Sequence, residues 1–152
     1  MKVNYQTKSK IHFIMAIIAT LCITTFFIST IIVELFGTHE QIVIVKSLVV
    51  MPGLFILVPA VMITGGTGFA LSKYRKGCII NGKKRRMPFI GVNGLIILLP
   101  SAIFLNQWAA AGSFDSLFYS VQAFELLAGA ANLILMGINI RDGIRLSGKL
   151  KK

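Results

Sequence analysis

The stretch IHFIMAIIATLCITTFFISTIIV, residues 11–33, contains no Asp, Glu, Lys or Arg in 23 residues. A helix of about 20 apolar residues crosses the hydrocarbon core of a bilayer, which is about 30 Å thick. Three more predominantly apolar runs follow, at residues 42–71, 87–107 and 117–140. Apolar residues make up 55% of the chain and charged residues only 14%, without the alternation that a soluble domain would show. The sequence therefore predicts an all-α integral membrane protein with four transmembrane helices in an antiparallel bundle.

The predicted helices form a single domain, residues 1–152, and cover about 11–36, 39–72, 87–108 and 114–141. A basic loop, residues 73–86, joins the second helix to the third. The first run is longer than the apolar segment of a signal peptide, which has about 7 to 15 residues. We therefore expect an uncleaved first helix.

The positions of the basic residues predict the orientation of the chain. Its net charge is +11, and fifteen of the sixteen Lys and Arg residues fall on one side of the predicted helices. They are Lys2, Lys8, Lys10, Lys73, Arg75, Lys76, Lys83, Lys84, Arg85, Arg86, Arg141, Arg145, Lys149, Lys151 and Lys152. By the positive-inside rule, both termini and the basic loop face the cytoplasm, as in a bacterial inner membrane. We expect these residues to contact anionic lipids, and the sequence offers no ordered base-reading groups for a nucleic-acid partner.

Local patterns predict where helices start and where they bend. Thr38 followed by Gln41 fits a capping box at the start of the second helix, and Asp115 suits the start of the fourth. Pro59 and Pro100 each lie inside an apolar run, and proline lacks the backbone donor that a helix needs. We expect kinks at these two prolines.

The fourth predicted helix carries a seam of polar and small residues. Their spacings are 3, 4, 3, 4 and 3, which places them on one face of a helix. They are Gln122, Glu125, Gly129, Asn132, Met136 and Asn139. Lipid cannot satisfy such groups, so we expect the seam to face other helices, of this chain or of a partner.

Two charged residues of opposite sign fall in the outer half of the predicted bundle. Lys46 alone breaks the positive-inside pattern. Glu125 lies about 9 Å inside the outer interface, at about 1.5 Å per residue, where an unpaired charge is costly. We predict that the two residues meet, either as a structural ion pair or as a proton or ligand site. The full predicted polar cluster consists of Glu34, Glu40, Gln107, Asp115, Gln122, Glu125 and Asn132.

His39, at the start of the second predicted helix, is the candidate ligand for a metal or a cofactor. Four-helix bundles suit a membrane-embedded porphyrin, and imidazole is a common axial ligand. His12 lies near the opposite end of the bundle, so bis-histidine ligation requires His39 from two copies of the chain on one haem b, with Lys46 near a propionate. The other arrangement is His39 with Met51 or with an open position.

These observations leave three classes of function open, one of which is a structural or assembly subunit whose polar seam on the fourth helix binds another membrane protein. The more specific prediction is a homodimeric electron-transfer protein with haem b at His39. The alternative is a small transporter, or an accessory subunit of a membrane complex, that uses Glu125 and Lys46 inside the bundle. Hydrolytic and nucleotide-binding patterns are not apparent, because HEQIV lacks the second histidine of the zinc motif and ITGGTGF lacks the lysine of a phosphate loop.

Overall fold

The computed structural model describes residues 4–73 and 77–146, which form four long helices. The first is α1 (Tyr5–Phe36), and the last is α6 (Ser116–Leu146). The second consists of α2 (His39–Leu48), the π-helical segment η1 (Val49–Leu54) and α3 (Phe55–Ser72). The third consists of α4 (Cys78–Val92), the π-helical segment η2 (Asn93–Leu98) and α5 (Leu99–Ala110). All four are long and apolar enough to cross a membrane, as the sequence predicted.

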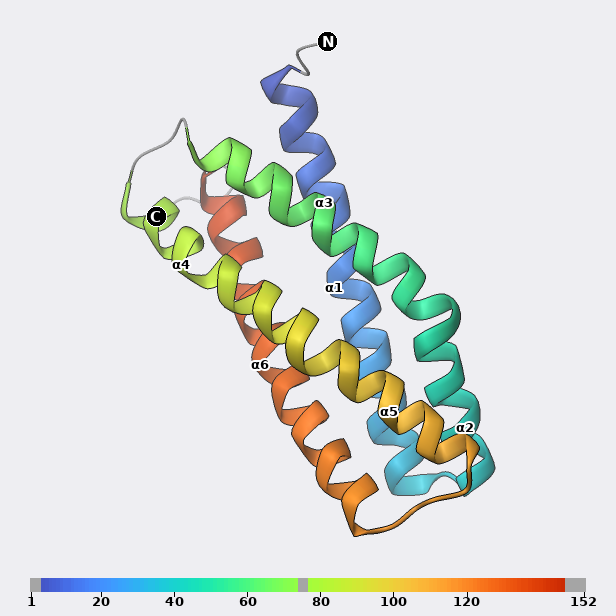
Figure 1. Cartoon of the computed structure of the whole chain (residues 1–152). Coiled ribbons are helices and arrows are strands. Elements are labelled where there is room, and N and C mark those ends of the chain that lie inside the picture. Colours follow the sequence, from blue (N-terminus) through green and yellow to red (C-terminus); the bar gives the residue numbers. More distant parts are fainter. Residues whose placement is uncertain (1–3, 74–76, 147–152) are drawn as a thin grey trace.

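The four helices pack antiparallel around a common interior (Figure 1). The start of α1, the end of α3, the start of α4 and the end of α6 meet at one end of the bundle, which we call the terminal end. The connections at residues 37–38 and 111–115 lie at the opposite end, which we call the loop end. Which end faces the cytoplasm stays a prediction from the basic residues. Of these, Lys2, Arg75, Lys76, Lys149, Lys151 and Lys152 lie outside the described residues.

Both predicted helix caps are present at the loop end. The Thr38 backbone N–H donates to Gln41 Oε1 at 3.0 Å, and the Gln41 N–H donates to Thr38 Oγ1 at 3.4 Å. Asp115 Oδ1 accepts from the Phe118 N–H at 2.9 Å at the start of α6. Each side chain satisfies a donor that the first turn of a helix leaves without a partner. The caps therefore define where the second and fourth helices begin.

The helix breaks differ in part from the prediction. The second helix departs from helical geometry at Met51 (φ −135°, ψ 110°), just before Pro52, whereas Pro59 continues inside α3. The departure from helical geometry in the second helix therefore lies about two turns before Pro59, and the kink expected at Pro59 itself stays a prediction. In the third helix, η2 ends two residues before Pro100. It includes Ile96, the residue four positions before Pro100, whose carbonyl oxygen loses its usual helical donor because proline has no N–H.

The third helix begins earlier than the sequence predicted. We expected a loop over residues 73–86, but α4 already starts at Cys78. Lys and Arg are good helix formers, so a basic segment can extend a helix beyond its apolar part. The connection between the second and third helices is correspondingly short, and Arg86 lies within a helix.

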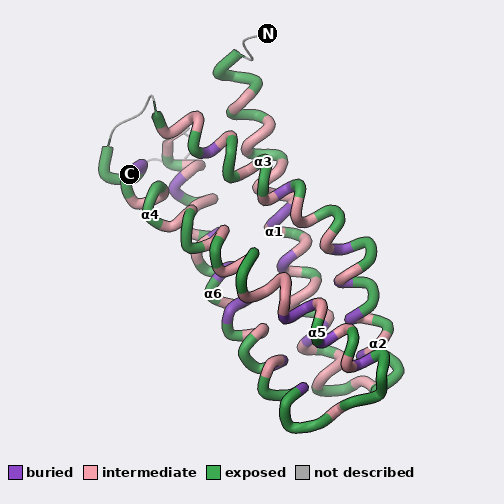
Figure 2. The backbone as a smooth tube through the Cα atoms, viewed as in Figure 1, coloured by how far each residue is buried: buried purple, intermediate pink, exposed green. Residues whose placement is uncertain are grey.

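The surface and the interior of the bundle have the polarity expected in a bilayer. Large apolar side chains such as Phe55, Phe89 and Leu127 are among the most exposed, and Figure 2 shows how few residues are fully buried. Several polar side chains are buried instead: Thr30, Lys46, Ser101, Gln122, Asn132 and Asp142. Apolar side chains can face lipid at no cost, whereas polar groups need partners inside the protein. This pattern indicates a small multi-pass membrane protein.

Two apolar clusters fill the interior at different depths. One, near the loop end, contains Ile42, Leu105, Ala109 and Phe118. The other, nearer the terminal end, contains Ala19, Ile23, Ala60 and Met136. Phe118 and Met136 both belong to α6, so the residues between them line the middle of the bundle. The part of the α6 seam from Gln122 to Asn132 therefore faces a layer between the two apolar clusters.

Candidate functional site

The centre of the candidate site is an ion pair between α2 and α6. Lys46 Nζ lies 2.9 Å from Glu125 Oε2, and the exposed fractions of the two side chains are 1% and 14%. The predicted meeting of these two residues is confirmed. The pair joins residues that are 79 positions apart in the chain. A buried charge is costly unless it is paired and hydrogen-bonded, so the contact holds the second and fourth helices together at this depth.

Two further side chains complete the polar cluster. Gln122, one turn before Glu125 on α6, donates from Nε2 to the same oxygen, Glu125 Oε2, at 3.2 Å. Glu34 of α1 interacts electrostatically with Lys46, Glu125 and His39. Its Oε1 is buried and accepts no hydrogen bond from the described residues. Glu34, Lys46 and Glu125 together supply two carboxylates and one ammonium group. We call these three residues the Glu34–Lys46–Glu125 cluster.

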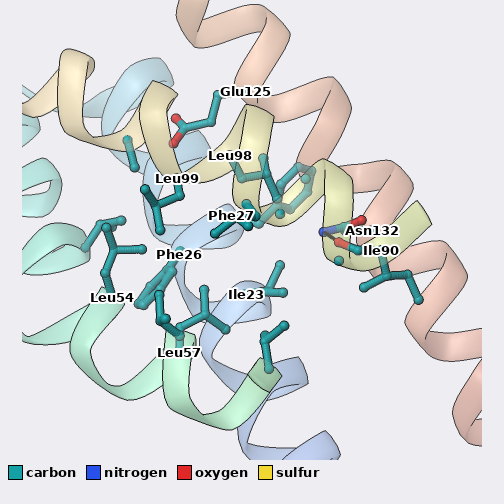
Figure 3. Close-up of a pocket in the computed structure, with 18 of the residues that line it drawn as sticks. Ile23, Phe26, Phe27, Leu54, Leu57, Ile90, Leu98, Leu99, Glu125 and Asn132 are labelled. Carbon is teal, nitrogen blue, oxygen red and sulfur yellow. Dashed lines mark hydrogen bonds between the residues drawn. The ribbon is translucent and has the colours of Figure 1, made fainter. Parts of the chain in front are cut away.

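An apolar cavity of about 360 Å³ lies next to this cluster. Glu125 belongs to its lining, as do Thr30 of α1 and Asn132 of α6. Figure 3 shows Glu125 and Asn132 on one side of the cavity, and Leu54 and Leu57 on the other. Most of the remaining lining is aliphatic or aromatic. A mainly apolar cavity with a few polar groups is the usual form of a small-molecule site.

A second polar contact lies beside the cavity, between η2 and α6. Asn93 of η2 donates from Nδ2 to Asn132 Oδ1 and to the carbonyl oxygen of Ala128, both at 2.9 Å. Asn132 donates in turn to the Ile90 carbonyl oxygen at 3.4 Å. The two amide side chains therefore fix η2 against α6. The seam on α6 predicted Asn132 as an interior residue, but not Asn93 as its partner.

The terminal end has an ion pair of its own, which the sequence reasoning missed. The Arg86 guanidinium of α4 pairs with Asp142 of α6, and Arg86 Nε donates to Asn139 Oδ1 at 2.9 Å. Asp142 is buried. Its position three residues after Asn139 places it near the same face of α6 as the seam, and this signal could have identified it as an interior residue.

His12, the second histidine, also has a structural partner at the terminal end. Its Nδ1 lies 3.0 Å from the Thr64 carbonyl oxygen and 3.2 Å from Thr67 Oγ1, both on α3. The Gly68 position packs against His12 and Met87. These contacts hold α1, α3 and α4 together, far from the cavity's acidic side chain.

Three residues of the predicted polar cluster do not join the buried group. Glu40, Gln107 and Asp115 are exposed at the loop end, where Asp115 serves as the cap of α6. Their side chains lie where the predicted helices leave the bilayer, so water or headgroups can satisfy them. Within this set, Gln122 and Asn132 are buried and Glu34 and Glu125 are half-buried, and this separates them from the three exposed residues.

The residues of the haem prediction lie apart from one another. The His39 ring stacks on Phe114, with centroids 4.1 Å apart and planes 9° from parallel. Met51 is exposed and lies twelve residues farther along, which is about 18 Å at about 1.5 Å per residue. That separation does not suit a pair of ligands on opposite faces of one haem. Among the described residues there is also no group of three or more His, Cys, Asp or Glu that could hold a metal ion. Haem binding by His39 from two copies stays a prediction.

Fold and site together define the class: a small multi-pass membrane protein whose four helices enclose a buried ion pair beside an apolar cavity. Comparison of the chain with protein-family models, with curated proteins and with solved structures found no significant match.

Proposed function

We propose that this protein is a small membrane transporter in which the Glu34–Lys46–Glu125 cluster carries a proton that is coupled to movement of a solute. The observation that supports the proposal is that Glu125 belongs both to the ion pair and to the cavity lining. One of its oxygens, Oε2, binds Lys46 and Gln122, while the residue also lines the cavity. Its charge state therefore affects both the contact between helices and the space in which a solute can bind.

Charge balance defines what the cluster can do. Two carboxylates and one ammonium group, all ionised, would leave one net negative charge inside the bundle, which is unfavourable in a medium of low dielectric constant. A single proton shared by Glu34 and Glu125 makes the cluster neutral. Lys46 then pairs with whichever carboxylate is ionised. Proton transfer from one glutamate to the other would move the Lys46 partner from α6 to α1.

Such an exchange of partners changes which helices are held together. With Glu125 ionised, Lys46 joins the second helix to the fourth, as in the described structure. With Glu125 protonated and Glu34 ionised, Lys46 would join the second helix to the first. The breaks at η1 and η2 lie beside the cavity and supply the points at which the second and third helices can bend. The cluster thus couples protonation to the shape of the cavity.

The test is the slow proton movement that an incompletely coupled transporter allows without added solute, measured on the purified, reconstituted protein. We would trap a pH-sensitive dye in phosphatidylcholine liposomes, impose a pH gradient, add valinomycin with potassium to cancel the electrical potential, and record how fast the gradient decays. Wild-type protein is expected to dissipate the gradient faster than Glu125→Gln, which cannot bind a proton at that position. The matched control is Glu40→Gln, the same change at an exposed glutamate, which is expected to behave like the wild type.

The outcome separates transport from a purely structural ion pair. Thermal unfolding of both variants shows whether each is folded before its rate is compared. If folded Glu125→Gln protein dissipated the gradient as fast as the wild type, the proposed function would be rejected.

A further inference from the structure

The cavity has a second set of features that indicates what it binds. Its volume, about 360 Å³, falls within the range of small-molecule sites, which is about 300 to 1,000 Å³. Phe26 and Phe27 of α1, Leu57 of α3 and Leu98 of η2 are among its apolar lining. Such a surface favours an apolar or aromatic molecule over a hydrated ion or a sugar, because neither of those would recover the hydrogen bonds it makes in water.

The side of the cavity between the second and third helices is open. Met62 of α3 and Leu95 of η2 line the cavity, and their exposed fractions are 70% and 63%. Gly65, also in the lining, has open space where a side chain would begin, with no atom within 4 Å. In a bilayer this side faces the acyl chains and not water. A ligand therefore reaches the cavity from within the membrane.

The charged group in the cavity lining is a carboxylate. Glu125 uses Oε2 for Lys46 and Gln122, while its Oε1 accepts no hydrogen bond from the described residues. The described lining contains no Lys or Arg, and the Asn132 side chain is occupied by Asn93 and by the Ile90 carbonyl. A positive group in the cavity can therefore lie against Oε1 of Glu125, whereas a negative group would meet a cluster in which two carboxylates outnumber the single ammonium group of Lys46.

We propose that the cavity binds a lipophilic organic cation, which enters sideways from the bilayer between α3 and η2. This inference deepens the proposed function and rests on it for its role in transport, since it names the solute class. The bound cation and the proton would compete for Glu125, because either one neutralises the same carboxylate. Competition for one acidic group is what exchange of a proton for a cation across the membrane requires.

The test is binding to the full chain in phosphatidylcholine nanodiscs, measured by equilibrium dialysis, with tetraphenylphosphonium as the probe. Tetraphenylborate, which has nearly the same size and shape and the opposite charge, is the matched ligand control. We expect saturable binding of the phosphonium and not of the borate, after subtraction of binding to empty nanodiscs. Glu125→Gln should weaken phosphonium binding about tenfold or more, because it removes a charge contact in a medium of low dielectric constant. Glu40→Gln should leave it unchanged.

A second variant tests the entrance separately. Gly65→Leu places a bulky side chain in the open space beside the cavity without meeting another atom of the described fold at the first side-chain position. We expect it to weaken or slow phosphonium binding while Glu125 and Lys46 stay paired. Equal binding of phosphonium and borate, or unchanged binding in folded Glu125→Gln protein, would overturn the proposal.

The two proposals can fail independently. Charge-selective binding without proton movement in liposomes would reject the transport function and leave the cation site in place. Proton movement that depends on Glu125, with no phosphonium binding, would reject the cation site and leave the proton function in place. Occupation of the cavity by an ordinary acyl chain would appear as no binding of either probe, and would also reject the cation site.

Discussion

Replacing Lys46 with methionine tests whether the ion pair has the energetic weight that its burial implies. Methionine keeps most of the length and the apolar part of the side chain but removes the charge. The lysine is only 1% exposed and its Nζ lies 2.9 Å from Glu125 Oε2. Removing one partner of a buried ion pair costs about 3 to 5 kcal/mol. Interhelical hydrogen bonds in membranes contribute less, about 0.6 kcal/mol on average and about 1.7 kcal/mol at most, which favours the lower end of that range. We therefore expect a loss of about 3 kcal/mol.

That loss converts into a measurable change in melting temperature. For a chain of about 150 residues, 1 kcal/mol shifts Tm by about 2 to 4 °C, so Lys46→Met should lower it by about 6 to 12 °C. The assay is thermal unfolding in mild detergent, followed by the fluorescence of Trp108, which is the single tryptophan and packs beside the loop-end apolar cluster. The control is Lys73→Met, because Lys73 is exposed at the terminal end and its change should alter Tm very little.

A double-mutant cycle separates the pair from its members. Glu125→Gln removes the other charge, and the double variant removes both. If the two residues stabilise the fold through each other, the double variant should lose less than the sum of the single losses, by about 1.5 kcal/mol or more. Simple additivity, or a Lys46→Met melting temperature equal to that of the Lys73 control, would show that the pairing contributes no net stability and refute the reasoning.

Three further perturbations have defined outcomes. Gly53→Ala would place a methyl carbon 2.6 Å from Phe26 Cζ, so we expect the free energy of unfolding to fall by about 1 to 3 kcal/mol in the same unfolding assay. Its control is Gly65→Ala, which meets no atom within 4 Å and should stay within about 0.5 kcal/mol of the wild type. Thr38→Ala removes the cap of α2 and should cost about 1 kcal/mol, which chemical unfolding with sodium dodecyl sulfate can measure; no change would mean that the cap is dispensable. The haem prediction expects a Soret band in purified protein that His39→Ala abolishes, and a colourless preparation from cells supplied with haem would reject it.

Much of the architecture could be predicted from the sequence, because hydrophobic length is a property of the chain alone. A run such as residues 11–33 must be helical in a bilayer to satisfy its own backbone groups. The meeting of Lys46 and Glu125 followed from the same physics, since each is a charge that lipid cannot solvate and the two carry opposite signs. The caps at Thr38 and Asp115 depend only on neighbouring residues, and they too were predicted correctly.

The rest depends on how the helices are placed, which the sequence does not reveal. Pro52 and Pro59 are both prolines inside one apolar run, and the sequence did not single out Pro52 as the one beside the departure from helical geometry at Met51. Arg86 looked like one more residue of a basic loop until α4 brought it next to Asp142. Glu34 was predicted as part of the polar cluster, but its electrostatic interaction with Lys46 depends on how α1 packs against α2. The cavity is likewise a property of four helices together and has no signature in any one of them.

The position of Lys46 in the chain also has a consequence for how the protein is made. A lysine at the centre of a transmembrane helix raises the free energy of membrane insertion by about 2.5 to 3.5 kcal/mol, and Lys46, seven residues after the helix start at His39, carries part of that cost. Its final partner, Glu125, is synthesised 79 residues later, which takes about 4 to 16 s at about 5 to 20 residues per second. Glu34, in contrast, precedes Lys46 by twelve residues and already lies in the first helix. We expect it to hold the ammonium group while the ribosome completes the fourth helix, so that the first hairpin can leave the insertion machinery before the bundle is whole.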